Sequence, residues 1–225
     1  MTDVIDFGAM PSGNVAQRIN ANAIPLLDLQ ALARIEPTPK QFIIPKLAPG
    51  GEVTVFSGAG SAGKSLFAQQ VATALAAGVA TLRLTMGQAP AIYLTCEDDE
   101  RELHFRQSNI CRALGIDMER LAGILHLGSL RGLLDNELGK FAADGTFQPT
   151  EMLDRLQALI ERTGAALVCL DNLAHFFIGN ENDRGEVTRF MNALGALTLN
   201  PEAKAPTKAP KANGYGGMGE NAKGQ

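Results

Sequence analysis

The eight residues GAGSAGKS, at positions 58–65, constrain the fold of this chain more than any other segment. They match the pattern Gly-x-x-x-x-Gly-Lys-Ser/Thr, in which glycines let the backbone approach an anion and successive N–H groups form a concave anion site. The preceding segment, GEVTVFS (51–57), is apolar and β-branched, which predicts a buried strand. The following segment, SLFAQQVATALAAG (65–78), is rich in Ala and Leu and ends in glycine, which predicts a helix. Strand, loop and helix in this order are the context that a phosphate-binding loop requires.

The positions of the loop predict specific contacts with a nucleotide. Lys64 is expected to reach the β- and γ-phosphates, and the Ser65 hydroxyl is expected to hold Mg²⁺. The alternative is a glycine-rich turn with a chance Lys-Ser pair, which the strand and helix around the loop disfavour. The residues predicted to bind ATP are Gly58, Ala59, Gly60, Ser61, Ala62, Gly63, Lys64 and Ser65.

Composition restricts the class of protein. A chain of 225 residues that is 45% hydrophobic can form one domain with extensions. It has no run of about 18 apolar residues, so no membrane span is expected, and its N-terminus lacks the pattern of a signal peptide. Cys96, Cys111 and Cys169 show neither close pairing nor metal spacing, which is typical of reduced thiols in a cytoplasmic protein. The net charge of −4 argues against a broadly basic surface, although it is compatible with a basic channel for nucleic acid.

Strands and helices alternate after the loop, which predicts an α/β fold with a doubly wound parallel sheet. We expect an N-terminal arm (1–42), a core (43–199) and a tail (200–225) whose Pro-, Lys- and Gly-rich composition predicts disorder. Residues 131–150 are mostly polar and are expected to be irregular, and Thr150 is expected to cap the helix that follows. The other elements expected in the core are strands at 90–97, 123–130 and 165–172 and helices at 98–115, 151–164 and 186–197.

Carboxylates follow two of these strands, at the edge where α/β sheets bind their ligands. Asp171 ends an apolar strand and is predicted to accept a hydrogen bond from a Mg²⁺-bound water or from Ser65; the alternative is an ordinary aspartate at a strand end. Glu97 is the first acid after its strand and is predicted to be the general base that activates the attacking water. In the alternative, this acidic segment only begins a helix, a role that we assign to Asp98, Asp99 and Glu100.

Three segments in this order resemble the RepA-type hexameric replicative helicases of plasmids and mobile elements, which contain a RecA-like P-loop ATPase domain. The resemblance covers about residues 43–197, and the second and third segments are much more specific than the loop. The segments are the loop at 58–65, IYLTCEDDERELHFR at 92–106 and LVCLDNLAHFFIGNENDRGEVTRF at 167–190.

The resemblance implies an ATPase that uses ATP and Mg²⁺, assembles into homo-oligomeric rings, hexamers in the family, and moves on single-stranded DNA. It assigns phosphate and Mg²⁺ to Lys64 and Ser65, the catalytic base to Glu97, and the second acidic strand residue to Asp171. The relatives continue with further strands that carry a γ-phosphate sensor and DNA-binding loops. Only 54 residues follow Asp171 here, and the tail offers little apolar surface. We therefore expect the late strands to be missing and strand-separating activity to be weak or absent.

Two other functions remain open at this stage. One is a non-motor nucleotide-binding module that assembles or regulates a partner, or an inactive fragment of a helicase. The other is a small-molecule kinase, for which the sequence shows no Arg-rich lid. Stimulation of ATP turnover by single-stranded DNA distinguishes the motor from both.

Overall fold

The computed structural model of this chain describes residues 26–199. Contacts divide the chain into two units, of which the first ends at Lys40 and the second begins at Gln41. The described part of the first unit contains one short helix, α2 (Leu29–Leu32), whose residues are all exposed. The expected tail and the first 25 residues of the expected arm lie outside the described residues. No helix of the described part has the length and apolar character that crossing a bilayer requires.

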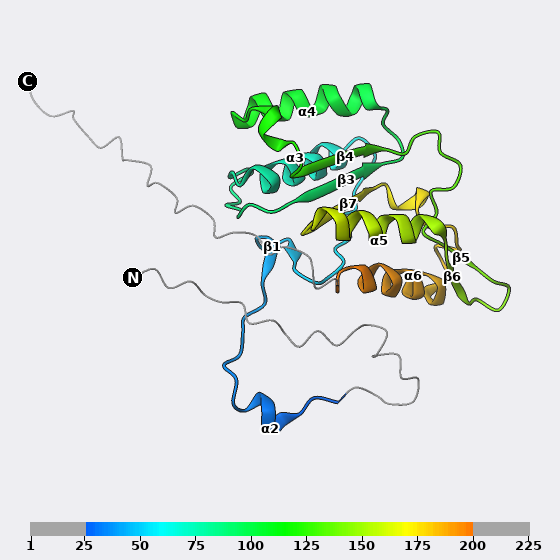
Figure 1. Cartoon of the computed structure of the whole chain (residues 1–225). Helices are drawn as coiled ribbons and strands as arrows, with labels where there is room; N and C mark the ends of the chain where they lie inside the picture. Colours follow the sequence, from blue (N-terminus) through cyan, green and yellow to red (C-terminus); the bar gives the residue numbers. More distant parts are fainter. Residues whose placement is uncertain (1–25, 200–225) are drawn as a thin grey trace, which may run out of the picture. The chain divides into compact units, whose positions relative to one another are not determined.

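The second unit is built on a parallel sheet of three strands in the order β4-β3-β7 (Figure 1). The predicted α/β class with a parallel sheet is confirmed. The elements of this unit are β1 (Phe42–Ile44), β2 (Ala48–Pro49), α3 (Lys64–Ala77), β3 (Ala91–Thr95), α4 (Glu100–Leu114), the 3-10 helix η1 (Met118–Leu121), β4 (Leu125–Ser129), β5 (Gly139–Phe141), β6 (Phe147–Pro149), α5 (Glu151–Thr163), β7 (Leu167–Asp171), the 3-10 helix η2 (Leu173–His175) and α6 (Arg184–Leu197).

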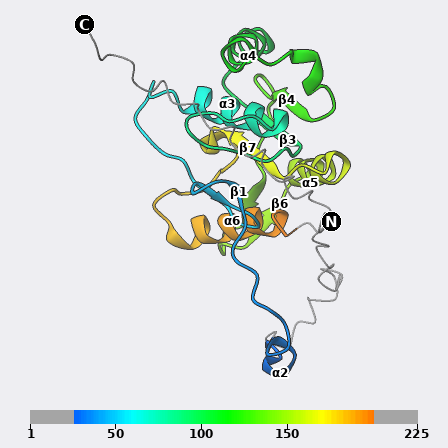
Figure 2. The same ribbon diagram turned by 90° about the vertical axis from the view of Figure 1, so that its left-hand side faces the viewer.

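Helices cover both faces of the sheet (Figure 1 and Figure 2). Successive side chains of β3 point to opposite faces. Ala91 and Tyr93 pack with α3 and with Leu103 of α4 in one buried cluster. Ile92 and Leu94 pack with α5 and α6 in a second cluster. The central strand is therefore buried on both sides, which explains why its sequence is apolar without alternation.

The carboxyl ends of the three strands lie at one edge of the sheet. Thr95, the last residue of β3, is paired with Ser129 of β4 on one side and with Asp171 of β7 on the other. Paired residues of neighbouring strands point to the same face, and residues two apart do so as well. Asp171 therefore shares with Tyr93 and Thr95 the face of the sheet that α3 covers.

The prediction of a buried strand at residues 51–57, before the loop, is wrong. Residues 53–59 have no regular secondary structure, and no described residue pairs with residues 51–57 in a ladder. Val55 and Phe56 are each 59% exposed, and the segment runs from β2 to α3 outside the sheet (Figure 2). The β-branched side chains of this segment favour an extended backbone. A strand also needs a neighbouring strand to pair its backbone N–H and C=O groups, and none lies beside this segment among the described residues. Among the described residues, β7 pairs only with β3 and leaves its other edge without a strand.

Residues 131–150 are more ordered than we expect from their polarity. β5 and β6 pair antiparallel within this range. Their side chains Phe141 and Phe147 contact each other, and they also contact Phe177 and Phe190, which come from later in the chain. The expectation of irregular structure is wrong because the partners that bury this hairpin are distant in sequence.

The predicted helices form, and glycines end three of them. Gly78, Gly115 and Gly164 adopt the left-handed conformation after α3, α4 and α5, with φ of 67°, 66° and 61°. Thr150 occupies the N-cap position of α5, but its side chain makes no cap hydrogen bond. The predicted N-cap position is therefore confirmed, although the Thr150 hydroxyl donates to the Glu137 carbonyl rather than accepting from the first turn of α5.

Candidate functional site

The loop at 58–65 adopts an open turn that leads directly into α3. Ser61 and Gly63 have positive φ values of 58° and 81°, so the turn uses the left-handed conformation twice. A β-carbon added at Gly60 or Gly63 would meet nothing within 4 Å, which leaves space above the loop. No side chain caps the N-terminus of α3. The unpaired N–H groups of its first turn and the positive end of the helix are suited to an anion.

The side chain of Lys64 folds back over the loop that precedes it. Its Nζ donates to the carbonyl oxygens of Gly58 at 2.8 Å and Ala59 at 2.7 Å. These bonds hold the ammonium group beside the loop, where it can exchange a carbonyl partner for a phosphate oxygen. They also brace the turn, since one cation joins two successive carbonyl groups.

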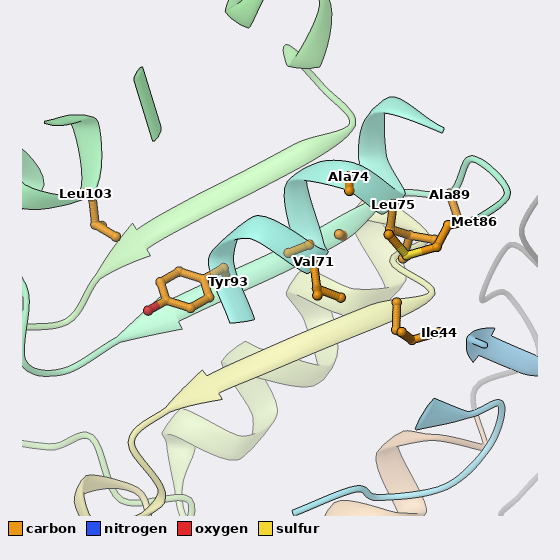
Figure 3. Close-up of a cluster of buried hydrophobic side chains, with 10 residues drawn as sticks. Ile44, Val71, Ala74, Leu75, Met86, Ala89, Tyr93 and Leu103 are labelled. Atoms are coloured by element: carbon orange, nitrogen blue, oxygen red, sulfur yellow. The ribbon is translucent and has the colours of Figure 1, made fainter. Parts of the chain in front are cut away.

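The start of α3 lies toward the same edge of the sheet as the carboxyl ends of the strands (Figure 3). The labelled Val71 and Leu75 give the direction of α3, which runs against the arrows of the strands. The helix packs on β3 and β7 through one buried cluster. Lys64 and Ser65 are therefore placed near the edge where β3 and β7 end.

Asp171 is held by a side chain from the neighbouring strand. The hydroxyl of Tyr93 donates a hydrogen bond of 2.6 Å to Asp171 Oδ2. Tyr93 is fully buried, and Asp171 is half-buried. Burial first, and the bond to Asp171 second, raise the pKa of Tyr93 far above its ordinary value. The phenol therefore remains a hydrogen-bond donor to the carboxylate.

Glu97 lies exposed just after β3 and accepts a hydrogen bond from the residue that follows β7. The side-chain amide of Asn172 donates to Glu97 Oε1. The backbone N–H of Glu97 donates to the Thr95 hydroxyl at 3.2 Å. Each acid is thus held by a neutral donor from the other strand: Asp171 by Tyr93, and Glu97 by Asn172.

The three acids after Glu97 have different contacts. Asp99 is the N-cap of α4 and accepts from the Glu102 N–H at 2.9 Å, and Glu100 is the first residue of that helix. The assignment of both to the helix start is confirmed. Asp98 differs, because its Oδ2 forms an ion pair of 2.8 Å with Arg106. An open hollow of about 610 Å³ lies beside these acids, lined by Asp98, Asp99, Arg101, Glu102, Phe105 and Arg131.

A buried polar network joins α3 to α4 beneath the site. Gln69 of α3 donates to Gln107 of α4 at 3.0 Å, and Thr73 donates to the same Gln107 oxygen at 3.1 Å. Arg106 donates to Gln69 at 3.2 Å as well as to Asp98. Burial is the largest single influence and acts to lower the pKa of Arg106, but the hydrogen bond to Asp98, the charge of Asp98 and smaller contributions together outweigh it, so the pKa is raised. The network links the helix of the phosphate loop to the residue after Glu97.

Two of the three thiols, those of Cys96 and Cys169, are unsuited to nucleophilic chemistry. The three cysteines are free, with Cys96 and Cys111 buried and Cys169 half-buried. Burial, followed by the charge of Asp171, raises the pKa of Cys96 to about 11 and that of Cys169 to about 12. Both therefore stay protonated near neutral pH, so the two thiols that flank Asp171 are structural.

The AAA domain family has a sequence model that matches residues 20–202 of this chain. This chain belongs to that family. AAA domains of this kind are P-loop ATPases and include RecA-like helicase domains. The α/β fold and parallel sheet are of the RecA-like P-loop NTPase type, and membership implies nucleotide binding and ATPase activity in general.

The predicted oxygen ligands of this AAA domain fit Mg²⁺. Ser65 and Asp171 offer the hard oxygens that Mg²⁺ prefers. Among residues 26–199, no group of three or more His, Cys, Asp or Glu is arranged to hold a metal ion. Mg²⁺ in nucleotide sites usually keeps several waters and is bound by one or two protein oxygens together with substrate phosphates, so Ser65 as a direct ligand and Asp171 acting through a water are sufficient.

The AAA domain brings the predicted residues to one edge of the sheet without joining them directly. In the described part of the chain, no hydrogen bond or ion pair connects Lys64 or Ser65 to Glu97 or Asp171. Sequence reasoning missed Tyr93 and the other side chains that hold the acids. A tyrosine in an otherwise apolar strand needs a partner for its hydroxyl, and that requirement was the available signal. Asn172 and Arg106 gave no comparable signal, because their partners depend on the register of β3 with β7 and on the packing of α4.

Proposed function

We propose that this chain is the ATP-binding and ATP-hydrolysing RecA-like domain of a RepA-type replicative DNA helicase. The observation that carries the enzymatic part is the meeting of three elements at one sheet edge: the uncapped start of α3, Asp171 and Glu97. The helicase assignment is supported by the resemblance of residues 92–106 and 167–190 to that family. Ring assembly and single-stranded DNA as a partner are parts of the same proposal.

Each residue has a defined part in the proposed reaction. The backbone N–H groups of 58–65 bind the β- and γ-phosphates, and Lys64 exchanges its carbonyl partners for phosphate oxygens. When bound, Mg²⁺ neutralises charge on the phosphates and orients them. Ser65 would hold that ion through its hydroxyl, and Asp171 would hold it through a bound water. Glu97 accepts a proton from the attacking water while Asn172 holds it in place.

The test of this proposal is ATP turnover with and without single-stranded DNA, combined with light scattering to give the oligomer size. We expect magnesium-dependent turnover that single-stranded DNA accelerates, in a homo-oligomer. Lack of any nucleotide binding by the folded chain would contradict the enzymatic part. An ATP turnover rate that is the same with and without single-stranded DNA would contradict only the helicase part of the proposal.

The segment before the phosphate loop favours a second candidate function. Residues 53–57 form no strand and have no ladder partner among the described residues, and no strand pairs with the outer edge of β7 there. A motor couples the state of its phosphate loop to the rest of its domain, and within residues 26–199 no strand pairing connects the loop segment to β7. A non-motor module that binds nucleotide to assemble or regulate a partner has no such requirement. It would bind Mg·ATP without DNA-stimulated turnover and without unwinding a forked duplex.

A further inference from the structure

The hydrogen bond between Tyr93 and Asp171 crosses the sheet diagonally. Tyr93 is paired in register with Cys169, so its hydroxyl reaches the residue two positions further along β7. Diagonal neighbours on one face of a sheet are within reach of long side chains. The ring of Tyr93 points its hydroxyl toward the arrowhead end of the strands, where the candidate site lies (Figure 3).

The bond has the character of a fixed contact. Its length of 2.6 Å is typical of an O–H donor on a carboxylate, which is a stronger bond than one between neutral groups. Tyr93 is 0% exposed, so water cannot replace the phenol from the side of the core. The ring is held by the cluster that contains Val71 and Leu75 of α3 and Leu103 of α4.

A neutral donor is the kind of partner that leaves a carboxylate available to a cation. The nearby cation, Arg106, is already engaged with Asp98 at 2.8 Å and with Gln69 at 3.2 Å. Asp171 is therefore oriented by a phenol that occupies one oxygen without neutralising its charge. The second oxygen keeps its capacity to accept from a water on Mg²⁺.

We infer that Tyr93 is a positioning residue for Asp171, which it orients toward the magnesium water through the phenol-to-carboxylate bond. This inference rests on the proposed function, because it assumes that Asp171 acts on Mg²⁺. Partners that orient direct metal ligands typically change metal affinity by about 10–100-fold when removed. Asp171 acts through water, so we expect a smaller effect for Tyr93, about 3–10-fold.

The experiment measures the Mg²⁺ dependence of nucleotide binding by the full chain, using a fluorescent ATP analogue. Tyr93→Phe keeps the ring and removes the hydroxyl. We expect it to bind the analogue in EDTA as the wild type does, but to need about 3–10-fold more Mg²⁺ for half-saturation. In an Asp171→Asn background the same change should have no further effect. Thr163→Val, which removes a half-buried hydroxyl whose hydrogen bonds stay within α5, is the control and should leave the Mg²⁺ requirement unchanged.

The outcomes separate this inference from the proposed function. If the wild type binds the analogue with magnesium and Tyr93→Phe needs the same Mg²⁺ concentration, the inference is wrong and the proposed function stands. An equal shift in the Asp171→Asn background would also overturn it, since Tyr93 would then act by another route. If the wild type binds no nucleotide, both fail together.

A second measurement does not depend on the stability of Tyr93→Phe. The chain has two tyrosines, so Tyr215→Phe protein labelled with 3-fluorotyrosine reports on Tyr93 alone. Adding Mg²⁺ to the ADP-bound labelled protein should shift this fluorine resonance, and the shift should vanish in Asp171→Asn. A resonance that does not respond to Mg²⁺ would overturn the inference.

Discussion

The side-chain amide of Asn172 donates a hydrogen bond to Glu97 and so joins the end of β7 to the end of β3. Asn172 Oδ1 accepts from the Ala174 N–H at 3.1 Å, which fixes the amide with its donor turned toward Glu97. The neighbouring acids are engaged elsewhere, Asp98 with Arg106 and Asp99 at the start of α4. Among these acids, Glu97 is the one that is exposed and held in a fixed orientation without forming an ion pair or capping a helix. This combination is what a general base requires.

Glu97→Gln should abolish most ATP turnover without preventing ATP binding. The amide oxygen of glutamine can still accept from Asn172, so the shape of the site persists and only the base is lost. A positioned general base contributes about 10²–10⁴ in rate, and we expect a decrease of that size. The measurement is phosphate release beside calorimetric ATP binding. Glu100→Gln, at an exposed acid in the first turn of α4, is the matched control, and unchanged turnover in Glu97→Gln would assign the base to another residue.

Lys64→Ala should weaken ATP binding by about 10–100-fold, the effect of losing a hydrogen bond to a charged group. The change removes the ammonium group that lies against the loop, and with it the bonds to the carbonyls of Gly58 and Ala59. Calorimetric titration of ATP into the variant checks this. Lys140→Ala removes an exposed lysine from β5 and controls for the change in net charge. Equal affinities for the wild type and Lys64→Ala would contradict the phosphate-binding role of the loop.

The sequence predicted the parts of the site that depend on local rules. The loop at 58–65 and the helix after it follow from residue types that a short segment contains. The placement of Asp171 and Glu97 at one edge follows from the alternation of strands and helices, because parallel strands end together. These predictions needed no knowledge of which strands are neighbours.

What the sequence did not predict depends on distant partners. Residues 51–57 have the composition of a strand, yet Val55 and Phe56 are exposed because no neighbouring strand receives them. The hairpin of β5 and β6 looked irregular because the aromatic side chains that bury it, among them Phe190, come from later in the chain. The sequence gives Tyr93 no role beyond its place in the strand expected at 90–97, since its contact with Asp171 depends on the register of two strands.

Gln69→Ala should lower the free energy of unfolding by about 1–3 kcal/mol, as expected when buried polar groups lose a partner. Gln69 is fully buried and bonds to the Leu103 carbonyl, to Gln107 and to Arg106. Urea unfolding followed by circular dichroism measures the change. Gln157→Ala is the control, because this exposed glutamine bonds only across one helical turn to Glu161, which is worth about 0.2–0.5 kcal/mol. Equal losses for the two variants would show that the network does not stabilise the fold.

The free energy of unfolding should decrease above pH 9 because of the two thiols beside Asp171. Cys96 and Cys169 titrate near 11 and 12 in the folded chain, whereas a cysteine in an unfolded chain titrates near 8.5. The contribution of the two thiols to the free energy of unfolding is fully present below the pKa of a cysteine in the unfolded chain. This contribution is lost as the pH rises toward the pKa values of the folded chain, because over that range only the unfolded state releases the protons. Each raised unit corresponds to about 1.4 kcal/mol, so we expect a loss of about 1–2 kcal/mol for each thiol between pH 9 and 11.

Urea unfolding at pH 7, 9, 10 and 11 tests this dependence, and Cys96→Ala/Cys169→Ala serves as the comparison. The variant lacks both titrations and should lose less free energy of unfolding over the same range. Tyr93 adds a loss of its own above pH 10, since its pKa is also raised in the folded chain, and this part should remain in the variant. The third thiol, Cys111, is present in both proteins and cancels in the comparison. Identical slopes for the two proteins between pH 9 and 10 would mean that Cys96 and Cys169 titrate in the folded chain as they do in the unfolded one.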